Sequence, residues 1–67
     1  MTFLYLVSVP IYKLSMGDQL HDENGQYLGR VDWILSAGHG SFIKVKLDSG
    51  LVLELPARDE IAVAKAA

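Results

Sequence analysis

The chain has 67 residues, of which 51% are apolar, a formal net charge of −2 and no cysteine. A domain of this length buries only roughly 60% of the surface that its unfolded chain exposes, so there is no room for a second core. The absence of cysteine excludes disulfides and thiolate metal sites and favours a reducing, cytoplasmic location. Acids and bases are scattered, which disfavours a strong electrostatic grip on DNA or RNA. The high apolar content predicts self-association or a standing protein partner.

The first segment, Phe3 to Val9, is rich in β-branched and aromatic residues and carries no charge. We expect a strand that is buried on both faces and that ends at Pro10, which cannot donate to a ladder. Residues 11–14 either resume the strand or form an arm. Residues 1–12 are fewer than the roughly 20 needed to cross a bilayer and lack a basic signal region, so no membrane insertion is expected.

A turn is predicted at Ser15–Asp18 and a short strand at Gln19–His21. Asn24-Gly25 is the strongest local signal, because this pair suits the two positive-φ positions of a type I′ hairpin turn. A long strand is expected over residues 26–36. Its two faces are predicted to hold Tyr27, Gly29, Val31, Trp33 and Leu35 on one side, and Leu28, Arg30, Asp32 and Ile34 on the other.

Residues 37–40 are expected to form a loop. Phe42 to Asp48 alternates cleanly, which predicts a strand with Ile43, Val45 and Leu47 inward and Phe42, Lys44 and Lys46 outward. A tight turn at residues 48–50 leads to a strand with Leu51, Leu53 and Leu55 inward. Pro56 ends that strand, residues 57–60 have the length of one helical turn, and residues 61–64 are apolar again.

These elements predict an all-β fold, a small barrel of five or six strands of the SH3-like or PRC type, with a short helical turn near residues 57–60. The chain is read as one domain, residues 1–67, in which residues 1–14 form the N-terminal strand or arm and residues 16–64 the barrel body. Gly29, inside a strand, predicts a bulge or a close backbone approach.

Few residues are candidates for chemistry. His21 and His39 have no second ligand at a metal-binding spacing, so no metal or other cofactor is expected. Gly38-His39-Gly40 precedes a strand, whereas a phosphate-binding glycine loop precedes a helix. No serine has an activating base at a recognisable spacing. We therefore predict a protein that is not an enzyme, unless an oligomer assembles a shared pore.

An outward strand face carries aromatic and basic residues. Small barrels bind single-stranded nucleic acid by stacking bases on exposed aromatics beside a positive groove. The candidates for such contacts are Arg30, Phe42, Lys44 and Lys46. The alternative is that the lysines keep a surface strand soluble and pair with acids across the sheet. Trp33, the one tryptophan, is expected either in the core or as an interface anchor.

From Met16 to Ile61 the order of motifs resembles the PRC-barrel family. The matching motifs, in order, are Gly17–Leu20, Asp22–Gly25, Leu28–Leu35, Ile43–Leu47, Leu51–Pro56 and Asp59–Ile61. The resemblance implies a six-stranded barrel that acts as a protein-docking module and has no catalytic residues. The apolar segment from Phe3 to Leu14 departs from the short lead-in of that family.

Taken together, the sequence predicts a protein-interaction module that associates with itself, and with another protein, through its apolar N-terminal strand. The predicted interface residues are Phe3, Tyr5, Val7, Tyr12 and Trp33. The alternative is a small nucleic-acid-binding barrel.

Overall fold

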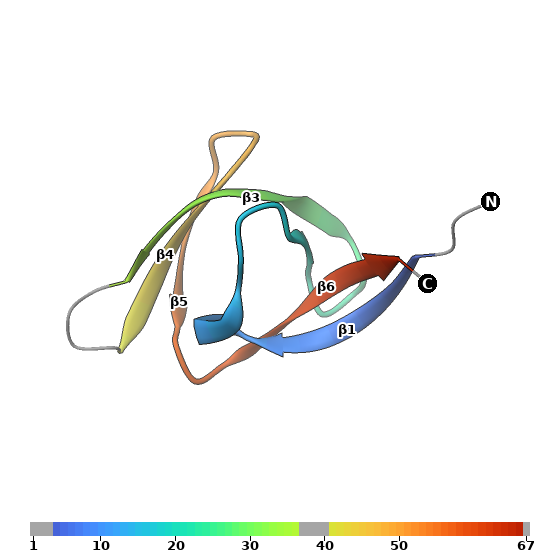
Figure 1. The fold of residues 1–67 in the computed structure, drawn as a ribbon, viewed down its shortest axis with the longest axis horizontal. Coiled ribbons are helices and arrows are strands. Elements are labelled where there is room, and N and C mark those ends of the chain that lie inside the picture. The colour runs from blue at the N-terminus through green and yellow to red at the C-terminus, as the bar shows by residue number, and fades with distance from the viewer. Residues whose placement is uncertain (1–3, 37–40, 67) are drawn as a thin grey trace.

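The structure, a computed structural model, describes residues 4–36 and 41–66 (Figure 1). It contains β1 (Leu4–Pro10), the 3₁₀ helix η1 (Ile11–Lys13), β2 (Gln19–His21), β3 (Tyr27–Ser36), β4 (Phe42–Leu47), β5 (Val52–Pro56) and β6 (Glu60–Ala66). The strands form one antiparallel sheet in the order β1-β6-β2-β3-β4-β5, which curls into a small barrel-like body. The all-β prediction is confirmed.

The core lies inside the curl of this sheet. Alternation along β4 directs Ile43, Val45 and Leu47 inward, as predicted, and Val45 and Leu47 are completely buried. Leu20 and Val63, which face each other across β2 and β6, are also completely buried. The full set of buried apolar residues is Ile11, Leu14, Leu20, Val31, Ile43, Val45, Leu47, Ala57 and Val63.

Two bulges change the faces of β3 from those predicted. The register shifts between Leu20 and His21 on β2 and between Val31 and Trp33 on β3. Since each extra residue reverses the alternation of side chains, the predicted inward face is broken up. Val31 is buried, whereas Tyr27, Trp33 and Leu35 are exposed.

Two hairpins share one turn geometry. At the first, the N–H of Gly25 donates to the carbonyl of Asp22, and at the second, the N–H of Gly50 donates to that of Leu47. Both glycines have positive φ, 83° and 93°, while Asn24 does not. The predicted hairpin at residues 24–25 is therefore present, but it is a three-residue loop with a left-handed glycine and not a two-residue type I′ turn.

Gly29 marks a close backbone approach, as predicted. Its φ is 149°, and a Cβ at this position would lie 3.1 Å from both Cβ and Cδ1 of Leu47 and from Oδ1 of Asp48. The same carboxylate oxygen of Asp48 accepts a hydrogen bond of 3.1 Å from the N–H of Arg30. The missing side chain therefore lets β3 cross closely over the end of β4.

The predicted helical turn at residues 57–60 is wrong. There the N–H of Asp59 donates to the carbonyl of Pro56, which makes a single reverse turn before β6 begins at Glu60. The helical turn of the described chain lies instead at Ile11–Lys13, where the sequence left strand and arm open. It buries Ile11, and Leu14 follows it into the core, so the N-terminal segment covers one end of the barrel.

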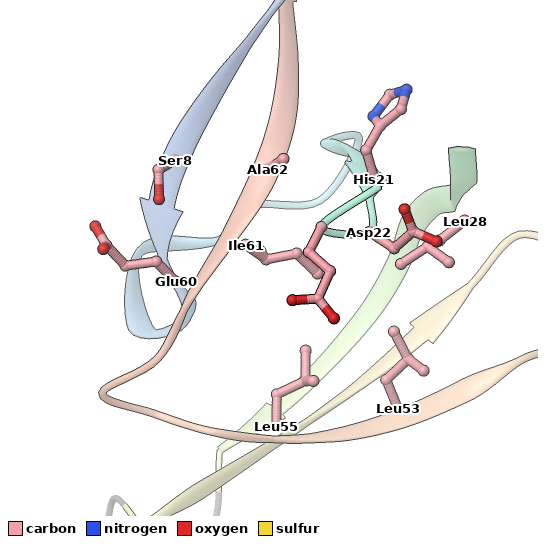
Figure 2. Close-up of a pocket in the computed structure, with 10 residues that line it drawn as sticks. Ser8, His21, Asp22, Leu28, Leu53, Leu55, Glu60, Ile61 and Ala62 are labelled. Carbon is pink, nitrogen blue, oxygen red and sulfur yellow. The ribbon is translucent and has the colours of Figure 1, made fainter. Parts of the chain in front are cut away.

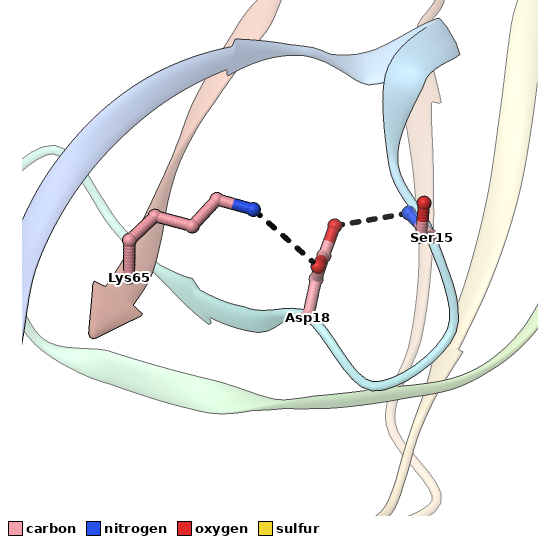
Figure 3. A network of polar contacts seen from close by, with 3 residues as sticks. All are labelled: Ser15, Asp18 and Lys65. Atoms are coloured by element: carbon pink, nitrogen blue, oxygen red, sulfur yellow. Dashed lines mark hydrogen bonds and ion pairs between the residues drawn. The ribbon is translucent and has the colours of Figure 1, made fainter. Parts of the chain in front are cut away.

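A small polar network holds the chain that enters β2 (Figure 3). The Asp18 carboxylate accepts a hydrogen bond of 2.9 Å from the N–H of Ser15, and its other oxygen lies 4.0 Å from Nζ of Lys65 on β6. The N–H of Asp18 also donates to the carbonyl of Ser15, which confirms the turn predicted at residues 15–18. This network ties the turn to the C-terminal end of β6.

Candidate functional site: two sheet edges and a groove

β1 lies at one end of the sheet and, within the described residues, pairs only with β6. It was predicted to be buried on both faces, and this is wrong: Leu4, Tyr5 and Leu6 are 61%, 51% and 48% exposed. β2 reaches along β6 only as far as the pair of Gln19 with Ala64, so Leu4 and Tyr5, which pair with Ala66 and Lys65, lie beyond its end. No other described strand continues the sheet beside this end of the β1–β6 ribbon.

The hydrogen-bonding pattern defines which backbone groups of β1 are free. The N–H of Ile11 donates to the carbonyl of Asp59, and the register then continues without a shift to Leu4 and Ala66. Because alternate residues of an antiparallel strand bond to the same neighbour, the even-numbered residues of β1 direct their N–H and C=O groups away from β6. The free edge therefore presents the backbone of Leu4, Leu6 and Ser8.

Proline positions agree with this assignment. Pro10 falls in the even-numbered set of β1, where its missing N–H removes no bond to β6. On β5, the bonds from the N–H of Leu47 to Leu51 and from the N–H of Ala57 to Ser41 assign the odd-numbered residues to β4. Pro56 is therefore also on a free edge. The two prolines of the chain each end one of the two terminal strands of the sheet.

The predicted interface residues do not form one patch. Phe3 lies outside the described residues. Tyr5 and Val7 point to the inner side of the β1–β6 ribbon, where Val7 is half-buried against Val63. Tyr12, 61% exposed, lies on η1, and Trp33, 45% exposed, lies on β3. The sequence analysis missed Leu4 and Leu6, which alternate with Tyr5. The available signal is Pro10, which is an even number of residues from both and therefore has its backbone on the same free edge.

The outer face of β3, β4 and β5 gathers most of the residues predicted to contact nucleic acid. Phe42, Lys44 and Lys46 point outward from β4, as predicted. The bulge in β3 adds Trp33, which pairs with Lys46 and lines a shallow hollow with it and Asp32. Arg30 is exposed but pairs with Gln19 on β2, outside both hollows of this face.

A second hollow on this face is lined by Leu35, Phe42, Lys44 and Glu54. Each hollow thus combines an aromatic ring, a lysine and a carboxylate. The two lysines face two acids, so this surface has no positive excess of its own.

A groove of about 490 Å³ lies between β5 and the part of the barrel formed by β1, β2 and β6 (Figure 2). Its apolar wall is made by Leu28, Leu53, Leu55 and Ile61. Figure 2 shows Leu53 and Leu55 pointing from β5 toward the strand that carries Ile61. Carboxylates of Asp22, Glu23 and Glu60 stand around it.

His21 belongs to the rim of this groove. Its ring lies 5.4 Å from that of Tyr27 at an angle of 60°, and its Nδ1 is buried without a hydrogen-bond partner among the described residues. Figure 2 shows the ring directed away from Leu53 and Leu55. His39, the other histidine, lies outside the described residues, as does the Gly38–Gly40 loop. Within residues 4–36 and 41–66, no group of three potential ligands could hold a metal ion.

Comparisons with known proteins place no relative beside this chain: no family model, no curated protein and no solved structure matches it. The resemblance to PRC-barrels stays a prediction. In the part of the chain that the structure describes, no helix is long and apolar enough to cross a membrane.

Proposed function

We propose that this protein is a cytoplasmic, non-enzymatic protein-docking module that associates with itself through the free edge of β1. The observation that carries the proposal is an unprotected sheet edge. Proteins usually blunt such edges with charges, prolines or bulges. From Leu4 to Val9, β1 has none of these, and its side chains at residues 4–6 are exposed and apolar.

A second copy fits this edge better than an unrelated strand, because the edge is short and self-complementary. An antiparallel pairing about a two-fold axis at Leu6 places Leu6 opposite its symmetry mate and Leu4 opposite Ser8 of the second copy. In each of these pairs both residues have free N–H and C=O groups, so the backbones can exchange both bonds. The result is an isologous dimer with one continuous sheet.

Leu6→Lys is the direct test. A lysine at the centre of the edge places like charges opposite each other in the dimer, and in the monomer it only replaces an exposed side chain. We expect the mass measured by light scattering after size exclusion to fall from two chains to one. Circular dichroism and the thermal midpoint at high dilution should change little. Leu51→Lys, at an equally exposed leucine in the β4–β5 turn, is the matched control and should stay dimeric.

Ser8→Pro separates backbone pairing from side-chain contact. Ser8 shares the parity of Pro10, so its N–H is free and the change breaks no bond to β6. We expect a folded monomer. A Leu6→Lys or Ser8→Pro protein that keeps the full dimer mass would contradict pairing through this edge.

A second candidate function is the binding of single-stranded nucleic acid by the outer face of β3, β4 and β5. Exposure of Trp33 beside Lys46 favours it, because an aromatic ring next to a cation can stack a base. The balance of acids and lysines on this face and the net charge of −2 weigh against it.

Trp33 provides the readout, since it is the only tryptophan. Binding of a thymidine oligonucleotide at low salt should quench its fluorescence and weaken linearly with the logarithm of salt concentration. The Lys44→Gln, Lys46→Gln double variant should lose the quench. An unchanged emission at low salt removes this candidate.

A further inference from the structure

The groove of Figure 2 lies between Leu53 and Leu55 of β5 and the strand that carries Ile61. Of the described residues that line it, two come from β5 and none from β4. β4 occupies one edge of β5, and the other edge is unpaired within the described residues. The odd-numbered residues of β5 bond to β4, so this unpaired edge presents the N–H and C=O groups of Val52 and Glu54, which do not themselves line the groove.

The side chains around the groove define what it can hold. Its wall offers leucine and isoleucine side chains that are only half-buried, which favours an apolar side chain of a ligand. The Asp22 carboxylate already accepts hydrogen bonds of 2.8 and 2.9 Å from the N–H groups of Asn24 and Gln26. Glu23 and Glu60, in contrast, are exposed, and the one ion pair found in the described chain joins Lys65 and Asp18.

Charge and backbone geometry together favour one kind of occupant. A cationic side chain on each side of an apolar one would meet Glu23 and Glu60 while the apolar group fills the groove. A strand laid against β5 would also satisfy the free groups of Val52 and Glu54. A small apolar cation could use the carboxylates but not this backbone ladder.

We propose that the groove binds an extended peptide segment of another protein, in which a bulky aliphatic residue is flanked at two residues on either side by lysine or arginine. The segment adds a strand to the free edge of β5. Residues spaced by two point to the same face of a strand, so the aliphatic group and both cations face the groove together. The groove meets the dimer edge on β1 only at Ser8, whereas Leu4 and Leu6 do not line it.

The probe is a fluorescein-labelled peptide, Thr-Arg-Thr-Leu-Thr-Arg-Thr, followed by fluorescence anisotropy. We expect saturable binding that weakens with salt. The Glu23→Gln, Glu60→Gln double variant should weaken it by about tenfold, which corresponds to about 1.4 kcal/mol. Asp32→Lys changes the net charge by the same two units at a residue of β3 that does not line the groove, and this matched control should bind like the parent.

Two further peptides test the geometry. A probe with its arginines moved to the neighbouring positions keeps the composition but points both cations away from the groove, and it should bind more weakly. A probe with N-methyl groups on the residues that face Val52 and Glu54 loses the ladder and should not bind. The Leu6→Lys protein should bind the original probe normally, which separates this site from the proposed dimer.

Three results would overturn the proposal. The first is no saturable anisotropy change up to about 1 mM protein. The second is equal weakening by the Glu23→Gln, Glu60→Gln double variant and by the Asp32→Lys control, which indicates only a general charge effect. The third is full binding of the N-methylated probe, which shows that no strand is added to β5.

Discussion

At the scale of single residues, Gly29 has the most demanding position in the chain. A side chain there would have to tolerate a positive φ of 149° and would lie 3.1 Å from Leu47, which is completely buried. Leu47 cannot move away without disturbing the core, so the crowding and the backbone strain add.

Gly29→Ala should therefore lower the free energy of unfolding by about 1–3 kcal/mol, measured by urea denaturation. Gly50→Ala is the control, because Gly50 also has positive φ, 93°, but a Cβ there meets nothing within 4 Å. The free energy of unfolding of Gly50→Ala should fall by less, about 1 kcal/mol. Equal losses in the two variants would show that the contact with Leu47 is unimportant.

The Asp18 network allows a second residue-scale prediction. Its ion pair with Lys65 is long, 4.0 Å, and the Lys65 side chain is 46% exposed. The pair therefore contributes little to the free energy of unfolding. The bond from the N–H of Ser15 is shorter, 2.9 Å, and loses its acceptor when the carboxylate is removed.

Asp18→Ala should destabilise the fold by about 1 kcal/mol, whereas Lys65→Ala should change it by less than about 0.5 kcal/mol. Thermal unfolding at two salt concentrations distinguishes the two contributions, since only the ion pair is screened. A Lys65→Ala loss as large as that of Asp18→Ala would mean that the charge pair dominates the network.

At the scale of elements, η1 places two neighbouring residues in opposite environments. Ile11 is 2% exposed and closes one end of the core, while Tyr12 is 61% exposed. The 3₁₀ turn also brings Ile11 and Leu14, three residues apart, to the same buried side, whereas a continued strand would have placed them on opposite faces.

Ile11→Ala should lower the free energy of unfolding by about 2–4 kcal/mol, a large part of the stability of so small a domain. Tyr12→Ala should change it by less than about 0.5 kcal/mol. If both variants unfold like the parent protein, η1 does not close the core as the structure describes.

The strands were predictable from the sequence where alternation is uninterrupted, as in β4, and where glycine marks a turn, as at Gly25 and Gly50. The faces of β3 were not, because a bulge depends on how two strands fit together and leaves no mark at Asp32 or Trp33. The exposure at the start of β1 was missed for a similar reason, because it depends on how far β2 reaches along β6, which no pattern within residues 4–10 records.

The candidate sites were predictable only in part. The outward row from Phe42 to Lys46 follows directly from period-two alternation. The groove joins Glu23, Leu55 and Glu60 from three separate segments, and no local pattern connects them. Pro10 and Pro56 were the available signals for the two sheet edges, but their meaning depends on which residues bond to the neighbouring strand.

At the scale of the whole molecule, self-association has a consequence for stability. If the folded chain dimerises and the unfolded chain does not, the thermal midpoint rises with protein concentration. We expect this rise for the parent protein and none for Leu6→Lys, measured by differential scanning fluorimetry over a hundredfold concentration range. A midpoint independent of concentration in both proteins would argue against a dimer of folded chains.

The central claim is that two copies join through the free edge of β1, and the molar mass in solution tests it most directly. Light scattering coupled to size exclusion, over a series of loading concentrations, should give the mass of two chains, with a shift toward one chain only at the lowest concentrations. A mass of one chain throughout would contradict the account, and would leave the exposed leucines of β1 without the partner proposed for them.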